Sequence, residues 1–197
     1  MDAEQLQVNL LVARVLDELR IPYFLGGSMA SSVHGIYRAT ADADFVALVR
    51  PDHAGPLAHL LHPGFYAEAE AIRTAAATGR SFNIIHLETL LKVDIFAATR
   101  PFQLTQMQRR ILQSLDADGK TCLYVASPED TILAKLEWYR QGGELSERQW
   151  NDVLGVLKVQ RERLDTKYLR LQAQELGLVE LFRRALDDAG LPLPESM

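Results

Sequence analysis

The sequence changes character at Ser127, and this change limits the folds that the chain can adopt. Before Ser127, short β-prone runs alternate with short helical patterns, and residues 80–88 and 90–98 favour neighbouring strands or a hairpin. At Ser127 the run SPED places a capping serine before a proline and two acidic residues, which is typical of a helix start. Further helical patterns follow toward the C-terminus. We therefore predict an α/β core over residues 1–126 and a helical region over residues 127–197.

The composition is that of an ordinary globular protein. Of the 197 residues, 48% are hydrophobic and 24% are charged, and no apolar run is long enough to span a bilayer. The N-terminus does not resemble a secretory signal, and the single cysteine, Cys122, excludes an internal disulfide. We therefore expect a cytoplasmic protein with no membrane partner. The net charge of −5 argues against a surface coated for nucleic acid, although a local basic patch is compatible with it.

Two aspartates stand one residue apart on a predicted strand over residues 42–49. Because side chains alternate between the two faces of a strand, Asp42 and Asp44 are expected on one face and Ala43 and Phe45 on the other. Paired carboxylates stay ionised when water or a cation compensates their charge, and their hard oxygen atoms suit Mg²⁺ or Mn²⁺ rather than zinc. The pair therefore indicates either a divalent-metal site or a solvated strand end.

A third aspartate interrupts the apolar run of residues 90–98. By the same alternation, Lys92 and Asp94 share one face of this strand. An aspartate in an apolar strand is unfavourable unless it is paired or bound to a metal. Asp94 is therefore either the partner of Lys92 or, if its strand lies beside that of Asp42 and Asp44, the third carboxylate of a metal site.

A turn of small residues, Gly26-Gly27-Ser28, follows a short apolar strand. Ser28 is expected to cap the helix that follows it. Bare backbone at a helix N-terminus offers N–H groups and a favourable dipole to an anion, so a phosphate can approach closely. The turn lacks the residues of a phosphate loop or of a dinucleotide fingerprint. It is therefore either a phosphate site of another kind or a plain tight turn.

These motifs together resemble the nucleotidyltransferase superfamily of the polymerase-β type. In that family Gly-Gly/Ser is followed by Asp-x-Asp on the next strand and by a third Asp on a later strand, and the runs GGS, DAD and KVD stand in this order here. The later runs SPEDTILAKLEWYR and SERQWNDV are similar to the AbiEii-type branch, which comprises nucleotidyltransferase toxins of toxin–antitoxin pairs. The resemblance covers residues 21–153. It implies a mixed-sheet nucleotidyltransferase core whose active-site cleft is completed by the C-terminal helices.

The resemblance implies a role for each matched residue of the core. In the turn Gly26–Ser28, the Gly27 backbone together with Ser28 would hold the β- and γ-phosphates of a nucleoside triphosphate (NTP). Asp42, Asp44 and Asp94 would bind two Mg²⁺ or Mn²⁺ ions. Asp94 would in addition act as a base toward the acceptor hydroxyl or orient it.

The resemblance also implies roles for three residues of the helical region. Lys135 would meet the triphosphate, Arg148 would contribute to nucleotide binding, and Asp152 would orient Lys135 or the acceptor. The alternatives are an exposed Lys135 and a plain surface ion pair between Arg148 and Asp152, which stand one helical turn apart.

The implied reaction moves a nucleoside monophosphate (NMP) from an NTP to a hydroxyl acceptor and releases pyrophosphate. By resemblance to the AbiEii-type branch, the first acceptor is the 3′ end of a tRNA or another RNA, and a cognate antitoxin is a possible partner. A small molecule such as an aminoglycoside or lincosamide, or a protein hydroxyl, is the alternative acceptor. A catalytically inactive relative that binds only nucleotide or a partner protein is the alternative to an enzyme.

Several further residues have a structural interpretation and a functional one. His59 and His62 do not form a metal-binding spacing with Cys122 and are expected near the surface. Trp138 and Trp150 stand in helical patterns and are expected to pack, although one of them could stack on a nucleobase. The basic stretch over residues 158–170 alternates with acidic residues, which favours a solvated helix face over an RNA contact.

Overall fold

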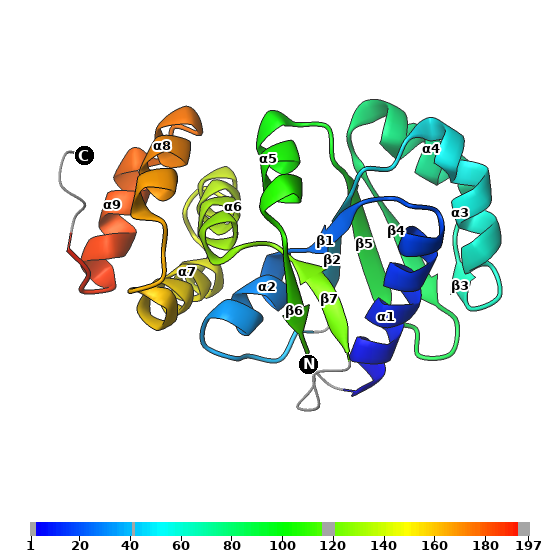
Figure 1. Ribbon diagram of the computed structural model, residues 1–197, viewed down its shortest axis with the longest axis horizontal. Helices are drawn as coiled ribbons and strands as arrows, with labels where there is room; N and C mark the ends of the chain where they lie inside the picture. The colour runs from blue at the N-terminus through cyan, green and yellow to red at the C-terminus, as the bar shows by residue number, and fades with distance from the viewer. Residues whose placement is uncertain (1–2, 41, 116–120, 193–197) are drawn as a thin grey trace. The chain divides into compact units, whose positions relative to one another are not determined.

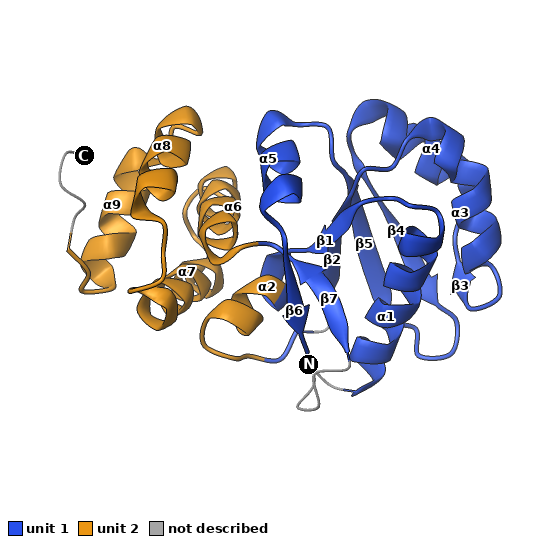
Figure 2. Cartoon of the chain, in the orientation of Figure 1, with its two compact units in different colours: residues 1–29, 39–126 blue, residues 30–38, 127–197 orange. Residues whose placement is uncertain are grey.

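The computed structural model describes residues 3–40, 42–115 and 121–192. The chain divides into two compact units (Figure 2). The first unit takes residues 1–29 and 39–126, and the second takes residues 30–38 and 127–197. The second unit therefore contains the helices after Ser127 together with a short earlier segment. The division of the chain into two domains at Ser127 stays a prediction.

The first unit is built on a mixed seven-stranded sheet in the order β3-β4-β5-β2-β1-β7-β6 (Figure 1). Its strands are β1 (Tyr23–Leu25), β2 (Ala43–Ala47), β3 (Phe65–Tyr66), β4 (Ser81–His86), β5 (Lys92–Ala97), β6 (Ile111–Ser114) and β7 (Cys122–Val125). The pairs β2–β5 and β1–β7 are parallel, and the other neighbours are antiparallel. The predicted α/β fold with a mixed sheet is confirmed, as are the neighbouring strands predicted over residues 80–88 and 90–98.

One face of this sheet is buried under helices of the same unit. Helix α4 (Ala69–Thr78) packs on β4 and β5, α3 (Ala54–Leu61) packs on α4, and α1 (Ala3–Glu18) packs on α3 (Figure 1). Toward these helices point Phe45, Ile95 and Phe82, which are side by side on β2, β5 and β4 and are all buried. Because side chains alternate along a strand, the residues between them lie on the opposite, more open face. The short helices η1 (Pro51–His53) and α5 (Pro101–Arg109) complete the unit.

Helix α2 (Gly27–His34) starts in the first unit and continues into the second. The second unit also holds α6 (Pro128–Gln141), α7 (Glu147–Gln160), α8 (Thr166–Glu175) and α9 (Val179–Asp188). Ser127 and Ser146 cap α6 and α7, since their side chains accept hydrogen bonds from the backbone N–H groups of Asp130 and Gln149. None of the described helices combines the length and the apolar character that a membrane span requires.

Ser28 was expected to cap α2, but the helix starts one residue earlier, so Ser28 is its second residue and not its cap. The Asp118-Gly119 pair stands between two apolar runs of the sequence, which predicts a hairpin. Its strands are confirmed, because β6 and β7 pair antiparallel. Its turn lies outside the described residues. Helices α4 and α5 were not anticipated from the sequence.

Candidate active site

Two of the predicted metal ligands stand side by side on the open face of the sheet. Strands β2 and β5 are parallel neighbours, and their register pairs Asp44 directly with Asp94. The next strand pairs Asn83 with Asp94, so Asn83, Asp94 and Asp44 form one row across three strands. Partners in register point to the same face of a sheet. The strands of Asp44 and Asp94 are therefore neighbours, an arrangement that the sequence allowed but did not establish.

Asp42 completes the acidic sequence motif but lies just before the first residue of β2, and it is exposed. We refer to Asp42, Asp44 and Asp94 together as the aspartate face. Among the described residues, no three Asp, Glu, His or Cys side chains come close enough to one another to hold a metal ion. The three-carboxylate metal site is thus not preassembled in this arrangement of side chains.

Asp94 is paired with a lysine on the same strand. The Lys92 ammonium lies 2.7 Å from Asp94 Oδ2, so Asp94 is paired with Lys92, as the alternative interpretation of the sequence held. The hydrogen bond to Asp94 raises the pKa of Lys92 above its ordinary value, against an opposing effect of burial. The charges of Asp94, Asp42 and Asp44 raise that pKa further. Lys92 is therefore within electrostatic reach of all three aspartates.

The glycine turn is held directly against the aspartate face. Gly26 N–H donates a hydrogen bond to the backbone oxygen of Asp44, at 2.8 Å. Gly27 has a left-handed φ of 53°, and a Cβ atom added to it would lie 1.9 Å from Asp44 Oδ2. Any larger residue at Gly27 would therefore collide with the Asp44 carboxylate. Gly27 is partly exposed, whereas Ser28 is only 6% exposed.

The donor chemistry of the aspartate face fits a hard divalent cation. Its ligand atoms are all carboxylate oxygens, the donors that Mg²⁺ and Mn²⁺ prefer. Two of the carboxylates are already in register, and the absence of a side chain at Gly27 makes room for the Asp44 carboxylate. In the described side-chain positions, Asp94 is held by Lys92 at 2.7 Å.

The other predicted site residues lie in the second unit and form a cluster of their own. Lys135 Nζ donates to Asp152 Oδ2 at 2.7 Å, and both side chains are buried. Arg38, which the sequence analysis did not single out, donates to both oxygens of Asp152, from Nε at 2.8 Å and from Nη2 at 2.9 Å. Asp152 on α7 thus joins a lysine on α6 to an arginine from the segment after α2.

Electrostatics in this cluster favour the charged form of Asp152. Burial alone would raise the pKa of Asp152, but the hydrogen bonds from Arg38 and Lys135 outweigh burial and lower it below its ordinary value. The hydrogen bond between Arg38 and Asp152 also raises the pKa of Arg38. The expectation that Lys135 is simply exposed does not hold, since its side chain is 8% exposed.

Arg148 is not part of this cluster. It is exposed, and among the described residues it forms no ion pair, so the surface pair of Arg148 with Asp152 is not observed. Trp150 packs instead of presenting a free ring. Its ring lies 5.0 Å from Tyr139, the Arg184 guanidinium covers it at 4.3 Å, and its Nε1 donates to Asp188.

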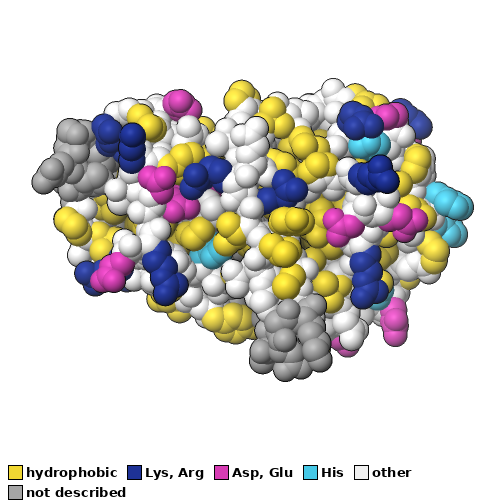
Figure 3. All heavy atoms as spheres, in the orientation of Figure 1, with side chains coloured by type: hydrophobic (Ala, Val, Ile, Leu, Met, Phe, Trp, Pro, Cys, Tyr) yellow, Lys and Arg dark blue, Asp and Glu magenta, His cyan; other side chains and the backbone are white. Residues whose placement is uncertain are grey.

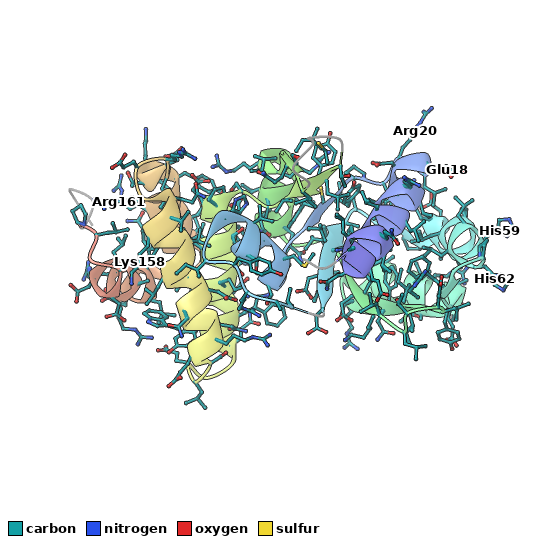
Figure 4. All side chains as sticks on the ribbon, turned by 90° about the horizontal axis from the view of Figure 1, so that it is seen from below. Glu18, Arg20, His59, His62, Lys158 and Arg161 are labelled. Carbon is teal, nitrogen blue, oxygen red and sulfur yellow. The ribbon has the colours of Figure 1, made fainter. Side chains whose placement is uncertain are left out.

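The remaining candidates lie at the surface. His59 and His62 project outward from α3, and Lys158 and Arg161 project outward near the end of α7 (Figure 4). All four are exposed, which agrees with the expected surface histidines and with a solvated basic face.

Asn83 and Arg38 are the polar residues near these clusters that sequence reasoning missed. Asn83 carried a signal, because in β4 exposed Ser81 and Asn83 alternate with buried Phe82 and Ile84. A polar alternation next to the aspartate strand marks the same open face. Arg38 carried no such signal, because its partner is 114 residues away in the sequence.

Comparison with known proteins identifies the fold. No family model and no curated protein matches the chain. Among solved structures, an antigenic nucleotidyltransferase-like protein from Paracoccidioides brasiliensis matches with a TM-score of 0.62 at 19% identity, over 96% of this chain and 93% of that one. The chain has a nucleotidyltransferase fold.

An antibiotic-resistance factor shares this fold as well. ANT(2'')-Ia in complex with adenylyl-2''-tobramycin matches with a TM-score of 0.56 at 10% identity, over 88% of this chain and 97% of that one. The solution structure of the same factor gives a TM-score of 0.54 at 12% identity, over 95% and 96% of the two chains. At these identities the likeness concerns the fold alone.

Proposed function

We propose that the protein transfers an NMP from an NTP to a hydroxyl group of an acceptor and releases pyrophosphate. The observation that carries this proposal is the juxtaposition of Asp44 and Asp94, in register on one open sheet face, with the glycine turn held against Asp44. The nucleotidyltransferase fold of the chain supports the same reaction class.

Each part of this face has a task in the proposed reaction. Asp42, Asp44 and Asp94 would hold Mg²⁺ or Mn²⁺, which when bound offsets the negative charge of the phosphates. The N–H groups in the first turn of α2, from Gly27 onward, would bind phosphate oxygens, because the dipole of a helix favours an anion at its N-terminus. The Asp94 carboxylate would accept a hydrogen bond from the acceptor hydroxyl and orient it.

The roles of Lys135, Asp152 and Arg148 stay predictions. Within the second unit, Asp152 holds the Lys135 ammonium at 2.7 Å, which is the orienting contact proposed for it. Ser28 is buried, so we assign phosphate binding to the Gly27 backbone rather than to the Ser28 hydroxyl.

We favour a small hydroxylated molecule as the acceptor. ANT(2'')-Ia, whose structure contains adenylyl-2''-tobramycin, shares the fold over nearly its whole length. The net charge of −5 also suits a cationic small molecule better than a polyanion. On the face shown in Figure 3, basic and acidic side chains are interspersed instead of forming one basic track.

RNA is the second acceptor class. It is favoured by the resemblance of the helical runs around Lys135 and Asp152 to the AbiEii-type branch, in which case a cognate antitoxin would be a partner. Co-purification with the product of a neighbouring gene tests that partner.

The test is an assay of NMP transfer. The protein is incubated with Mg²⁺ and each NTP labelled at the α-phosphate, in parallel with total RNA and with a panel of aminoglycosides and lincosamides. We expect label on a small-molecule acceptor. Asp44→Asn and Asp94→Asn should each lower the rate at least about a hundredfold, as the loss of a metal ligand or an orienting base does.

Asp52→Asn is the matched control for these variants. Asp52 is an exposed aspartate of the same unit and pairs with exposed Arg50 at 3.0 Å, so its loss should leave transfer unchanged. Label on RNA alone would select the second acceptor class. No transfer by the native protein to any acceptor, or full transfer by Asp94→Asn, would contradict the proposed function.

A further inference from the structure

The Lys92 ammonium occupies a position beside Asp94 to which the aspartate face would attract a divalent cation. Its ammonium lies 2.7 Å from Asp94 Oδ2, and Asp94 is in turn paired in register with Asp44. The Lys92 side chain is 47% exposed, so it can leave this position without breaking into the core. The pair is therefore a contact on the open face, between the residue proposed to orient the acceptor and a half-exposed cation of the same chain.

We propose that the Lys92 ammonium is a tethered counter-ion of the aspartate face, which a divalent metal ion must displace from Asp94. This inference rests on the proposed function for its biological meaning. The displacement itself concerns the charges of Lys92 and the three aspartates and does not require that NMP is transferred.

Charge balance gives the proposal its physical reason. Three carboxylates on one face repel one another, and without a cation that repulsion disfavours their ionised form. Lys92 supplies one positive charge on the same strand, two residues before Asp94. The aspartate face is thereby stabilised while no metal is bound.

The same charge works against metal binding. A divalent ion that approaches Asp94 meets the Lys92 ammonium at the carboxylate oxygen it would use. A unit charge about 5 Å from a divalent ion in water weakens binding by about tenfold. The native protein should therefore bind Mn²⁺ weakly in the absence of nucleotide.

A plain surface ion pair makes a different prediction. Exposed pairs of this kind contribute little to stability, and their removal changes nothing beyond the two partners. If Lys92 is instead the counter-ion of the aspartate face, its removal raises the affinity of that face for a divalent cation. Metal affinity therefore distinguishes the two interpretations.

The experiment measures Mn²⁺ binding without nucleotide, from the EPR signal of free Mn²⁺. We expect Lys92→Met to bind Mn²⁺ about tenfold more tightly than the native protein, and Lys92→Arg, which keeps the charge, to bind like the native protein. Lys158→Met is the matched control, since Lys158 is exposed and projects outward from α7 in the second unit (Figure 4). It should leave the affinity unchanged.

Thermal unfolding gives a second readout that needs no turnover. In EDTA, Lys92→Met should unfold at a lower temperature than the native protein, and saturating Mn²⁺ should raise its transition more than that of the native protein. Equal Mn²⁺ affinity of Lys92→Met and the native protein, or binding by neither, overturns the proposal. A gain shared by Lys92→Met and Lys92→Arg also overturns it, because charge would not be the cause. A gain by Lys92→Met alone in a protein that transfers no NMP would refute the proposed function and leave this inference standing.

Discussion

Gly27→Ala tests whether the glycine turn serves the aspartate face or merely turns the chain. Gly27 has a φ of 53°, and an added Cβ atom would lie 1.9 Å from Asp44 Oδ2 and 2.7 Å from Asp44 Cγ. The substitution therefore has two separable effects. It places an L-residue in the left-handed region, and it drives the Asp44 carboxylate out of its position.

The two effects differ in size and in readout. The left-handed conformation costs an L-residue about 1–2 kcal/mol. In a chain of this length, that cost corresponds to a fall of the melting temperature by about 2–8 °C. The displaced carboxylate adds little to this loss, because its far end can rotate toward solvent. Its effect should appear in NMP transfer instead, with a fall of at least about a hundredfold, as expected when a metal ligand is misplaced.

Gly143→Ala separates these effects. Gly143 has a φ of 71°, and an added Cβ atom would meet no heavy atom within 4 Å. Gly143→Ala should lose a similar amount of stability and keep full transfer activity. The assays are thermal unfolding and NMP transfer on both variants. If Gly27→Ala transfers NMP as fast as Gly143→Ala, the turn does not serve the aspartate face and the reasoning is refuted.

Three further predictions concern the Asp152 cluster and the open face. Asp152→Ala should lower the free energy of unfolding in urea by about 3 kcal/mol or more, because it leaves buried Lys135 without its carboxylate; Lys135→Met added to it should recover part of the loss. Because the pKa of Asp152 is lowered in the folded state, its stabilisation is complete above about pH 4 and is lost as the pH falls through the folded pKa. Native protein should thus lose stability below pH 4 more steeply than Asp152→Asn. Asn83→Ala should raise KM for the acceptor. It should change the unfolding free energy by less than about 0.5 kcal/mol, since Asn83 is exposed. An unchanged KM would show that Asn83 is not part of the site.

The sheet and the aspartate face were predictable because they depend on a period of two residues. Alternation places Asp44 and Asp94 each opposite a buried neighbour, Phe45 and Ile95, and only one face of a sheet is left for them. Their direct pairing needed more than alternation. The relative position of β2 and β5 depends on a parallel connection of more than forty residues, which no local pattern encodes.

The pairing of Asp94 with Lys92 shows where sequence reasoning stops. Alternation placed both residues on one face and left two partners open for Asp94, a lysine or a metal ion. The described side chains favour the lysine, at 2.7 Å. The choice depends on which cation is present and not on the fold, so the sequence could not decide it.

Arg38 was missed because its position depends on a close approach of two backbones and not on a motif. A Cβ atom at Gly35 would lie 2.8 Å from the backbone nitrogen of Val156, and one at Gly155 would lie 3.2 Å from that of Ile36. The segment after α2 therefore lies directly on α7, and this contact brings Arg38 to Asp152. Gly35 and Gly155 are 120 residues apart in the sequence, so their close contact is evident only in the folded chain. The Asp152 cluster thus depends on backbone packing for its third member, which explains why a search for charged motifs recovers Lys135 and Asp152 but not Arg38.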